Sequence, residues 1–129
     1  METPQDKWLP LKDTRTTAEG RWESSARFGP SSKWFSGHFD EWPLVPGVAI
    51  LTLVAETVKR QGREQGRFLE VSGFSGVRFK RFAFPDEELH ISVVVMPPRS
   101  EAKLDFDVTC HGNTVAQGVV KAVEELVHS

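Results

Sequence analysis

One histidine and one predicted helix start are the residues of this chain best suited to chemistry. His38 lies between Gly37 and Phe39, and Pro46-Gly47 opens a strongly apolar segment a short way further on. Histidine has an unperturbed pKa that suits proton exchange near neutral pH, and the free N–H groups of a helix start favour an anion. The two features are compatible with a site that moves a proton and stabilises negative charge. On residue types alone, a lone histidine of this kind is more often a hydrogen-bonded structural residue, and Pro46-Gly47 is equally a plain helix start.

The segment that begins at Pro46 predicts a central helix. Residues 48–55 are apolar except for Thr52, so we expect the helix to be buried on every side. Pro46 suits a first helical position, and Gly47 allows another group to approach the backbone closely. Gly62 follows a basic turn and predicts the end of the helix.

Alternating hydrophobic residues predict strands on both sides of this helix. Extended segments are expected at residues 21–28, 68–84 with an interruption at 73–76, 89–96, 103–111 and 114–124. In the second half of 68–84, the pattern points Val77, Phe79 and Phe82 inward. The two valine-rich faces of 89–96 are typical of a central strand that is covered on both sides.

Two further patterns complete the predicted architecture. Gly112-Asn113 predicts a two-residue hairpin turn, and residues 1–13 have little periodicity and predict an irregular arm. We therefore expect an α+β fold, in which a curved antiparallel sheet of five or six strands wraps one long helix. Residues 1–129 are expected to form a single domain.

Composition narrows the class of partner. The chain has 129 residues, of which 39% are hydrophobic, and a formal net charge of -2. This charge provides no basic field for nucleic acid or for an anionic membrane, so a small molecule or another protein is the expected partner. The sequence lacks an N-terminal apolar segment and a run of the roughly 18 apolar residues that a membrane span requires. We expect a cytoplasmic protein.

The single cysteine, Cys110, is expected to be a core residue, which is consistent with a reducing compartment. His111 follows it directly, and neighbouring residues of a strand point to opposite faces. This geometry is poor for a shared metal, so we predict neither a metal site nor a cofactor.

The motifs around the helix start resemble those of the FabA/FabZ-type beta-hydroxyacyl-acyl carrier protein dehydratases. Gly37-His38-Phe39, Pro43 and Pro46-Gly47-Val48 are similar to that family's GHFP…P…PGV motif, with the intervals intact. Val77 to Arg81, followed by Pro85-Asp86, is similar to its RFKRP-like strand and turn. The resemblance extends from about residue 31 to the C-terminus and implies the hot-dog fold.

The resemblance also implies roles for individual residues. Dehydration of a 3-hydroxyacyl thioester needs a base for the alpha proton, a group that holds the thioester oxygen and a donor for the departing hydroxyl. His38 matches the family's catalytic histidine, and the Gly47 N–H would hold the carbonyl. Phe39, Pro46 and Val48 would contact substrate. Arg78 and Lys80 would receive a phosphopantetheine phosphate or a carrier protein, although a solvated strand face explains these charges equally well.

Thr52 departs from the family pattern. Active members carry a glutamate or aspartate at this position of the helix, whereas a threonine hydroxyl is a poor proton donor near neutral pH. We expect Thr52 to orient a water or hydroxyl, or simply to bond to the helix carbonyl four residues back. Glu56 lies about one turn deeper on the same face and would replace the missing acid only through a water, which is the less favoured interpretation. Asp40 is expected to be a solvated turn residue.

Three functions remain open at this point. The first is a dehydratase-like enzyme that acts on acyl groups carried by acyl carrier protein or coenzyme A and assembles as a homodimer or higher homo-oligomer. The second is a non-catalytic module that binds acyl groups or their carrier protein, which the missing carboxylate favours. The third is an acyl thioesterase on the same fold. Acyl chain length, pathway and the choice of carrier are not encoded in any motif that we identify.

Overall fold

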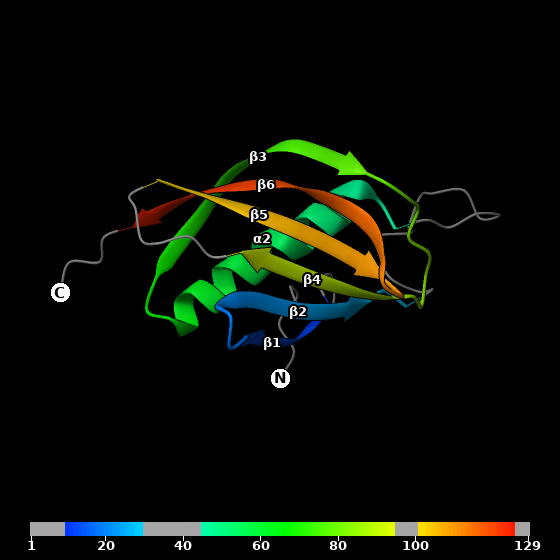
Figure 1. Cartoon of the computed structure of the whole chain (residues 1–129), viewed down its shortest axis with the longest axis horizontal. Helices are drawn as coiled ribbons and strands as arrows, with labels where there is room; N and C mark the ends of the chain where they lie inside the picture. The colour runs from blue at the N-terminus through cyan, green and yellow to red at the C-terminus, as the bar shows by residue number, and fades with distance from the viewer. Residues whose placement is uncertain (1–9, 30–44, 95–100, 126–129) are drawn as a thin grey trace.

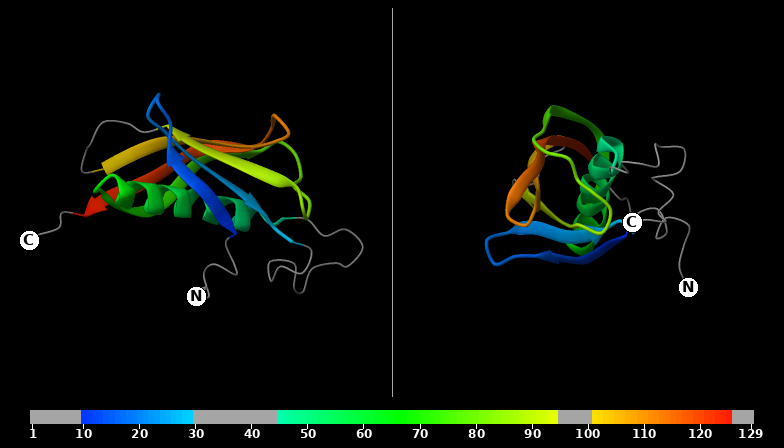
Figure 2. Two further views of the ribbon diagram at one scale, coloured as in Figure 1. Left: turned by 90° about the horizontal axis from the view of Figure 1, so that it is seen from below. Right: turned by 90° about the vertical axis from the view of Figure 1, so that its right-hand side faces the viewer.

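The computed structural model describes residues 10–29, 45–94 and 101–125. In these segments one helix, α2 (Gly47–Glu64), packs against a six-stranded antiparallel sheet. The strands are β1 (Leu11–Thr16), β2 (Arg21–Arg27), β3 (Phe68–Phe79), β4 (Glu88–Val94), β5 (Glu101–Cys110) and β6 (Asn113–Glu125). The sheet curls around the helix (Figures 1 and 2), so the predicted α+β architecture is confirmed.

The sheet has the order β1-β2-β4-β5-β6-β3, which leaves β1 and β3 at its two edges. Trp22 lies opposite Val93, Val93 opposite Phe106, and Phe106 opposite Gly118. These residues form an inward row across four strands. A Cβ at Gly118 would lie 3.0 Å from the Phe106 ring, so the glycine makes room for that ring. The inward row and α2 together form the core.

Helix α2 is buried on one side only. Its buried residues, among them Ala49, Ile50, Leu53 and Val54, face the sheet, whereas Val48 is 61% exposed. Figure 2 shows the helix lying in the concave side of the sheet, with its other side uncovered by strands. The prediction that this helix is buried all round was therefore wrong for a single chain, because the sheet covers only the inner face.

The end of α2 also differs from the prediction. The helix continues through Gly62 to Glu64, and Gly66 rather than Gly62 adopts the left-handed conformation, with φ 75°. Gly62 is needed for close packing instead, because a Cβ there would lie 3.1 Å from Leu69 Cδ1. Both residues are glycines for a physical reason, but only Gly66 ends the helix.

Two strands depart from their predicted form. Strand β1 begins at Leu11, inside the segment expected to be an irregular arm, and pairs with β2. Strand β3 continues through residues 73–76, where register shifts and Gly76 at φ 59° produce bulges instead of a break.

The predicted burial of individual side chains was only partly right. Phe79 is 50% exposed and Phe82 is 68% exposed, so neither is the inward residue that the alternation predicted. On β4, Leu89, Ile91 and Val93 are buried, but His90 on the opposite face is exposed. That strand is therefore covered on one face rather than on both.

Among the described segments, no helix combines the length and the hydropathy that a membrane crossing requires.

Candidate functional site

The first turn of α2 presents backbone N–H groups without a side-chain cap. Pro46 is the N-cap residue, and the turn contains no acidic residue. The amides of Ala49 and Ile50 donate to the Pro46 carbonyl at 3.0 and 3.2 Å. Within the described part of the chain, the Gly47 and Val48 amides have no such acceptor. The positive end of the helix dipole lies at these two donors, an arrangement that favours an anionic oxygen.

The end of β3 and the segment that follows it fix the position of this helix start. The Val45 N–H donates to the Ala83 carbonyl at 2.8 Å, directly before α2. The Phe79 ring packs on Gly47, where an added Cβ would lie 2.9 Å from Cζ. The close approach predicted for Gly47 is therefore present, and the group that approaches is an aromatic ring.

Apolar side chains lie beside the Gly47 and Val48 amides. Val48 follows Gly47 directly and the Phe79 ring packs on Gly47, and both are exposed large hydrophobic residues. This pair excludes water poorly by itself, but it would contact an apolar acyl chain or a second protein surface. It also agrees with the prediction that Val48 contacts substrate, which stays a prediction.

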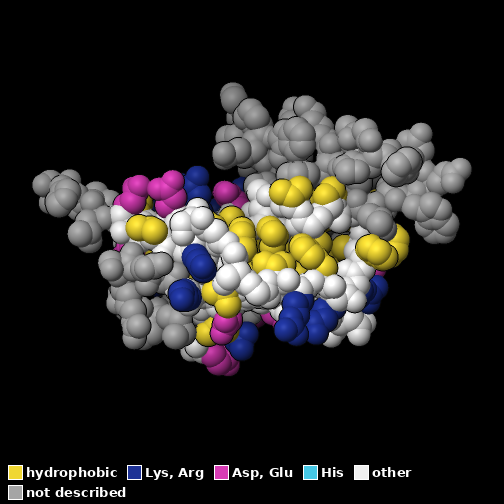
Figure 3. Space-filling model, turned by 90° about the horizontal axis from the view of Figure 1, so that it is seen from above, with side chains coloured by type: hydrophobic (Ala, Val, Ile, Leu, Met, Phe, Trp, Pro, Cys, Tyr) yellow, Lys and Arg dark blue, Asp and Glu magenta, His cyan; other side chains and the backbone are white. Residues whose placement is uncertain are grey.

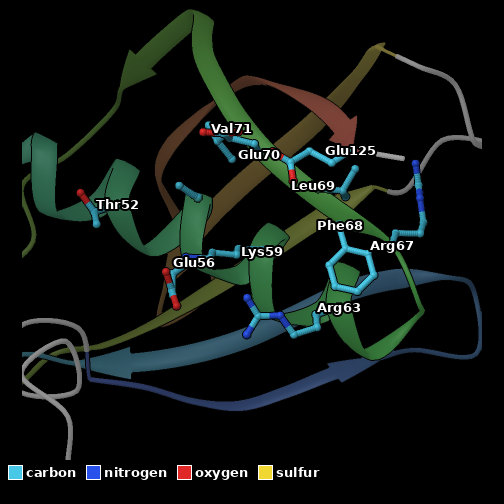
Figure 4. A pocket seen from close by; sticks show the side chains of 11 residues that line it. Thr52, Glu56, Lys59, Arg63, Arg67, Phe68, Leu69, Glu70, Val71 and Glu125 are labelled. Atoms are coloured by element: carbon cyan, nitrogen blue, oxygen red, sulfur yellow. The ribbon is translucent and has the colours of Figure 1, made fainter. Parts of the chain in front are cut away.

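Thr52 lies one turn further along the uncovered side of α2. Its hydroxyl donates to the Val48 carbonyl at 2.6 Å, the internal helix bond expected of a threonine with a purely structural role. The side chain is half-buried and lines the groove that Figure 4 shows. The hydroxyl proton is engaged in this bond within the helix, and the oxygen can still accept a hydrogen bond from a water.

A groove of about 330 Å³ runs from Thr52 towards the end of α2 (Figure 4). Helix residues Glu56, Lys59 and Arg63 form one wall, and β3 residues beginning at Phe68 form the other. Glu56 accepts a hydrogen bond from Arg60 at 3.0 Å, so this carboxylate is held by a neighbouring cation. No sequence pattern predicts the groove, because the edge of a sheet and the face of a helix meet only in the fold.

The predicted phosphate-binding residues do not line this groove. Arg78 lines a different hollow, together with Arg21, Ser92 and Asp107, and Lys80 is exposed beyond the end of β3. The Lys80 backbone N–H donates to the Val115 carbonyl at 2.7 Å. Arg78 and Thr52 are therefore not brought together in one site.

The predicted base and its neighbours lie outside the described residues. These are His38, Phe39 and Asp40. The structure thus places Pro46, Gly47, Val48 and Thr52 at the N-terminal half of α2, and the role of His38 stays a prediction.

A family model described as ApeI dehydratase matches residues 14–119 of the chain. Among curated proteins, the 3-hydroxyacyl-[acyl-carrier-protein] dehydratase FabZ of Cupriavidus metallidurans is 31% identical over 90 residues, or 60% of each chain. FabZ of Listeria welshimeri is 28% identical over 95 residues, covering 70% of this chain and 66% of its own length. The match thus spans less than two thirds of the length of these relatives.

Solved structures show the same fold. The dehydratase heterocomplex ApeI:P from Xenorhabdus doucetiae matches 88% of this chain and 96% of its own chain, with a TM-score of 0.71 at 22% identity. A hypothetical thioesterase with coenzyme A from Streptococcus pneumoniae matches 94% of this chain and 91% of its own, with a TM-score of 0.69 at 15% identity. The hot-dog fold expected from the sequence is confirmed.

Proposed function

Because this chain belongs to the ApeI-like dehydratase family, of the FabA/FabZ type, we propose that it is a 3-hydroxyacyl-thioester dehydratase. The substrate would be an acyl group carried by acyl carrier protein or coenzyme A. The observation that most supports this proposal is the start of α2, where Pro46 provides no side-chain cap and the Gly47 and Val48 amides have no acceptor among the described residues. The exposed side chains of Val48 and Phe79 lie beside these amides.

In the proposed reaction, the thioester carbonyl accepts a hydrogen bond from the Gly47 amide. Negative charge develops on that oxygen as the alpha proton leaves, and a positioned N–H donor lowers the barrier by on the order of 3 kcal/mol. His38 acts as the base that takes the proton. Val48 and Phe39 contact the acyl chain, and Pro46 sets the direction of the first turn.

The departing hydroxyl needs a proton donor of its own. The Thr52 hydroxyl donates a hydrogen bond to the Val48 carbonyl, so its remaining role is to accept a hydrogen bond from a water or from the leaving hydroxyl. The proton for the leaving group would then come from His38, which has just received it. In this route His38 acts first as the base and then as the acid, so we expect slow turnover.

The test is hydration of a short trans-2-enoyl thioester, the reverse of the proposed reaction, followed by loss of the enoyl absorbance. The wild-type protein should hydrate the substrate, and His38→Ala should lower the rate by roughly a hundredfold or more. Equal rates for the two proteins would contradict the role proposed for His38.

Thr52 favours a second candidate function, a subunit that binds acyl thioesters or their carrier without turning them over. A homodimer would carry Thr52 at every site, so each site would lack the usual acid. The similar Xenorhabdus doucetiae structure is a dehydratase heterocomplex, and under this second candidate a different partner subunit would supply the missing carboxylate to this chain.

One variant separates these two functions. Under the second candidate, the isolated wild-type protein binds acyl thioester without hydrating it, and Thr52→Glu gains hydration activity. Thr52→Gln, which has the same length and no ionisable group, is the matched control and should stay inactive. Hydration by the wild type that is lost in His38→Ala, even if slow, would exclude the binding-only function.

We also propose that the chain assembles as a homodimer through the edge of β3 and the uncovered face of α2. Strand β3 is twelve residues long and lies at the sheet edge, where unpaired backbone groups favour pairing with another strand. Exposed hydrophobic residues Val48, Phe68 and Phe79 lie on the helix and strand that border this face. Figure 3 shows hydrophobic side chains gathered on the side where β3 lies.

A further inference from the structure

Three side chains with metal-binding atoms converge at the turn between β5 and β6. They are Glu87, which precedes β4, and Cys110 and His111, which end β5 and begin the turn. One ligand atom of each lies within 4.8 Å of the other two. Thiolate, imidazole and carboxylate are the three ligand types that Zn²⁺ takes in proteins.

The backbone of the turn explains why adjacent residues can share a site. Strand β5 ends at Cys110, and His111 has a left-handed φ of 51°, followed by Gly112 at 80°. The turn therefore consists of His111-Gly112, one residue earlier than the predicted Gly112-Asn113. Because His111 has left the strand, the alternation that would place it opposite Cys110 no longer applies. The prediction that these residues point apart was therefore wrong.

The carboxylate of Glu87 is already oriented towards the thiol. Its Oε1 accepts a hydrogen bond from the Phe84 N–H at 2.8 Å, which fixes the side chain from the far side. Its Oε2 lies 3.5 Å from Cys110 Sγ. A backbone donor that holds a ligating carboxylate in this way is the usual second contact of a metal ligand.

The surroundings of the three ligands set the charge balance. Burial and the contact with Glu87 raise the pKa of the Cys110 thiol, so the metal-free site keeps its proton. Arg81 lies 3.9 Å from Glu87 Oε2 and would have to move away from an incoming cation. One divalent ion would balance one thiolate and one carboxylate, and His111 is exposed and gives access from solvent.

We propose that Glu87, Cys110 and His111 bind a single Zn²⁺ ion, with water as a fourth ligand. Two ligand atoms of one tetrahedral zinc lie roughly 3.5 Å apart, so the three groups need only small side-chain rotations to close on the ion. The thiol proton passes to solvent as the Zn–S bond forms, and no electron is transferred. The ion links the β5–β6 turn to the segment that holds Val45 before α2.

Cobalt provides a direct test, because a cobalt–thiolate bond gives a charge-transfer band in the near ultraviolet. The chain contains one cysteine, so this band can come only from Cys110. The untagged, chelator-treated full chain is titrated with Co²⁺, and Zn²⁺ is then added as a competitor. The proposal predicts a band that saturates at one ion per chain and is abolished by Zn²⁺.

Two variants and one control locate the remaining ligands. His111→Asn keeps a residue that tolerates the left-handed conformation, and Glu87→Gln keeps the shape of the carboxylate. Each should weaken binding by roughly tenfold or more, whereas His90→Asn, at an exposed histidine on β4, should not. A missing band in the wild type, or a band of unchanged affinity in His111→Asn, would overturn the proposal.

Discussion

Gly47 lies in the first turn of α2 and also contacts an aromatic ring. Its missing side chain leaves room for Phe79, whose Cζ would lie 2.9 Å from an added Cβ. The residue is thus required by space rather than by backbone conformation, since it is not among the glycines with positive φ. A substitution here should affect both the ring and the access to the two amides.

Gly47→Ala should lower the free energy of unfolding by about 1 kcal/mol, because the half-exposed Phe79 ring has to turn away from the new methyl group. The effect is measured by urea denaturation of Gly47→Ala, first alone and then in a Phe79→Leu background. The smaller leucine should remove most of the penalty. An equal penalty in both backgrounds would show that the ring is not its cause.

At the level of elements, sequence patterns predicted the helix and the strands whose buried residues recur at a regular spacing. Strand β2 and helix α2 carry their hydrophobic residues at the expected spacing, so their existence was predictable from local periodicity. Strand β1 was not, because its residues are mostly exposed and its pairing with β2 is interrupted by a bulge at Asp13.

Features that depend on contacts between distant residues were missed. Ser24 and Thr57 form a buried hydroxyl pair at 2.5 Å, and no local pattern joins them. The groove beside Thr52 requires β3 and α2 to be placed side by side. The candidate helix start was predictable because its residues are contiguous, whereas its aromatic neighbour Phe79 was assigned to the core by alternation alone.

The end of α2 gives a prediction for a single glycine. Gly66 adopts φ 75°, and its N–H donates to the Arg63 carbonyl at 3.0 Å, so Gly66→Ala should destabilise the protein by about 1 kcal/mol. Gly66→Asn should cost less, because asparagine tolerates the left-handed conformation. Thermal or urea unfolding of the two variants checks this order, and the reverse order would argue against a left-handed helix end.

At the scale of the whole molecule, the described strands cover one side of α2 and not the other. On this second side lie the start of the helix, the groove and the edge strand β3. Helix burial on every side, which the apolar sequence predicted, would be achieved if a second copy covered this face. The proposed homodimer therefore explains why the sequence is more apolar than a single chain requires.

Sedimentation velocity tests this assembly. The wild type should sediment as a dimer, and Val48→Glu should shift it towards monomer, because the charge would be buried at the interface. Lys103→Glu, at an exposed position on β5 away from the sheet edge, is the control and should leave the dimer intact. A wild type that sediments only as monomer would contradict the proposed interface.

The most direct test of the proposed activity is product analysis by mass spectrometry after incubation with a short trans-2-enoyl thioester. A dehydratase acting in reverse adds one water across the double bond and leaves the thioester intact, and this is the product we expect from the wild type. Release of free thiol would identify a thioesterase instead. Recovery of unchanged substrate, with carrier-protein and coenzyme A thioesters alike, would contradict catalysis at the start of α2 by this chain alone.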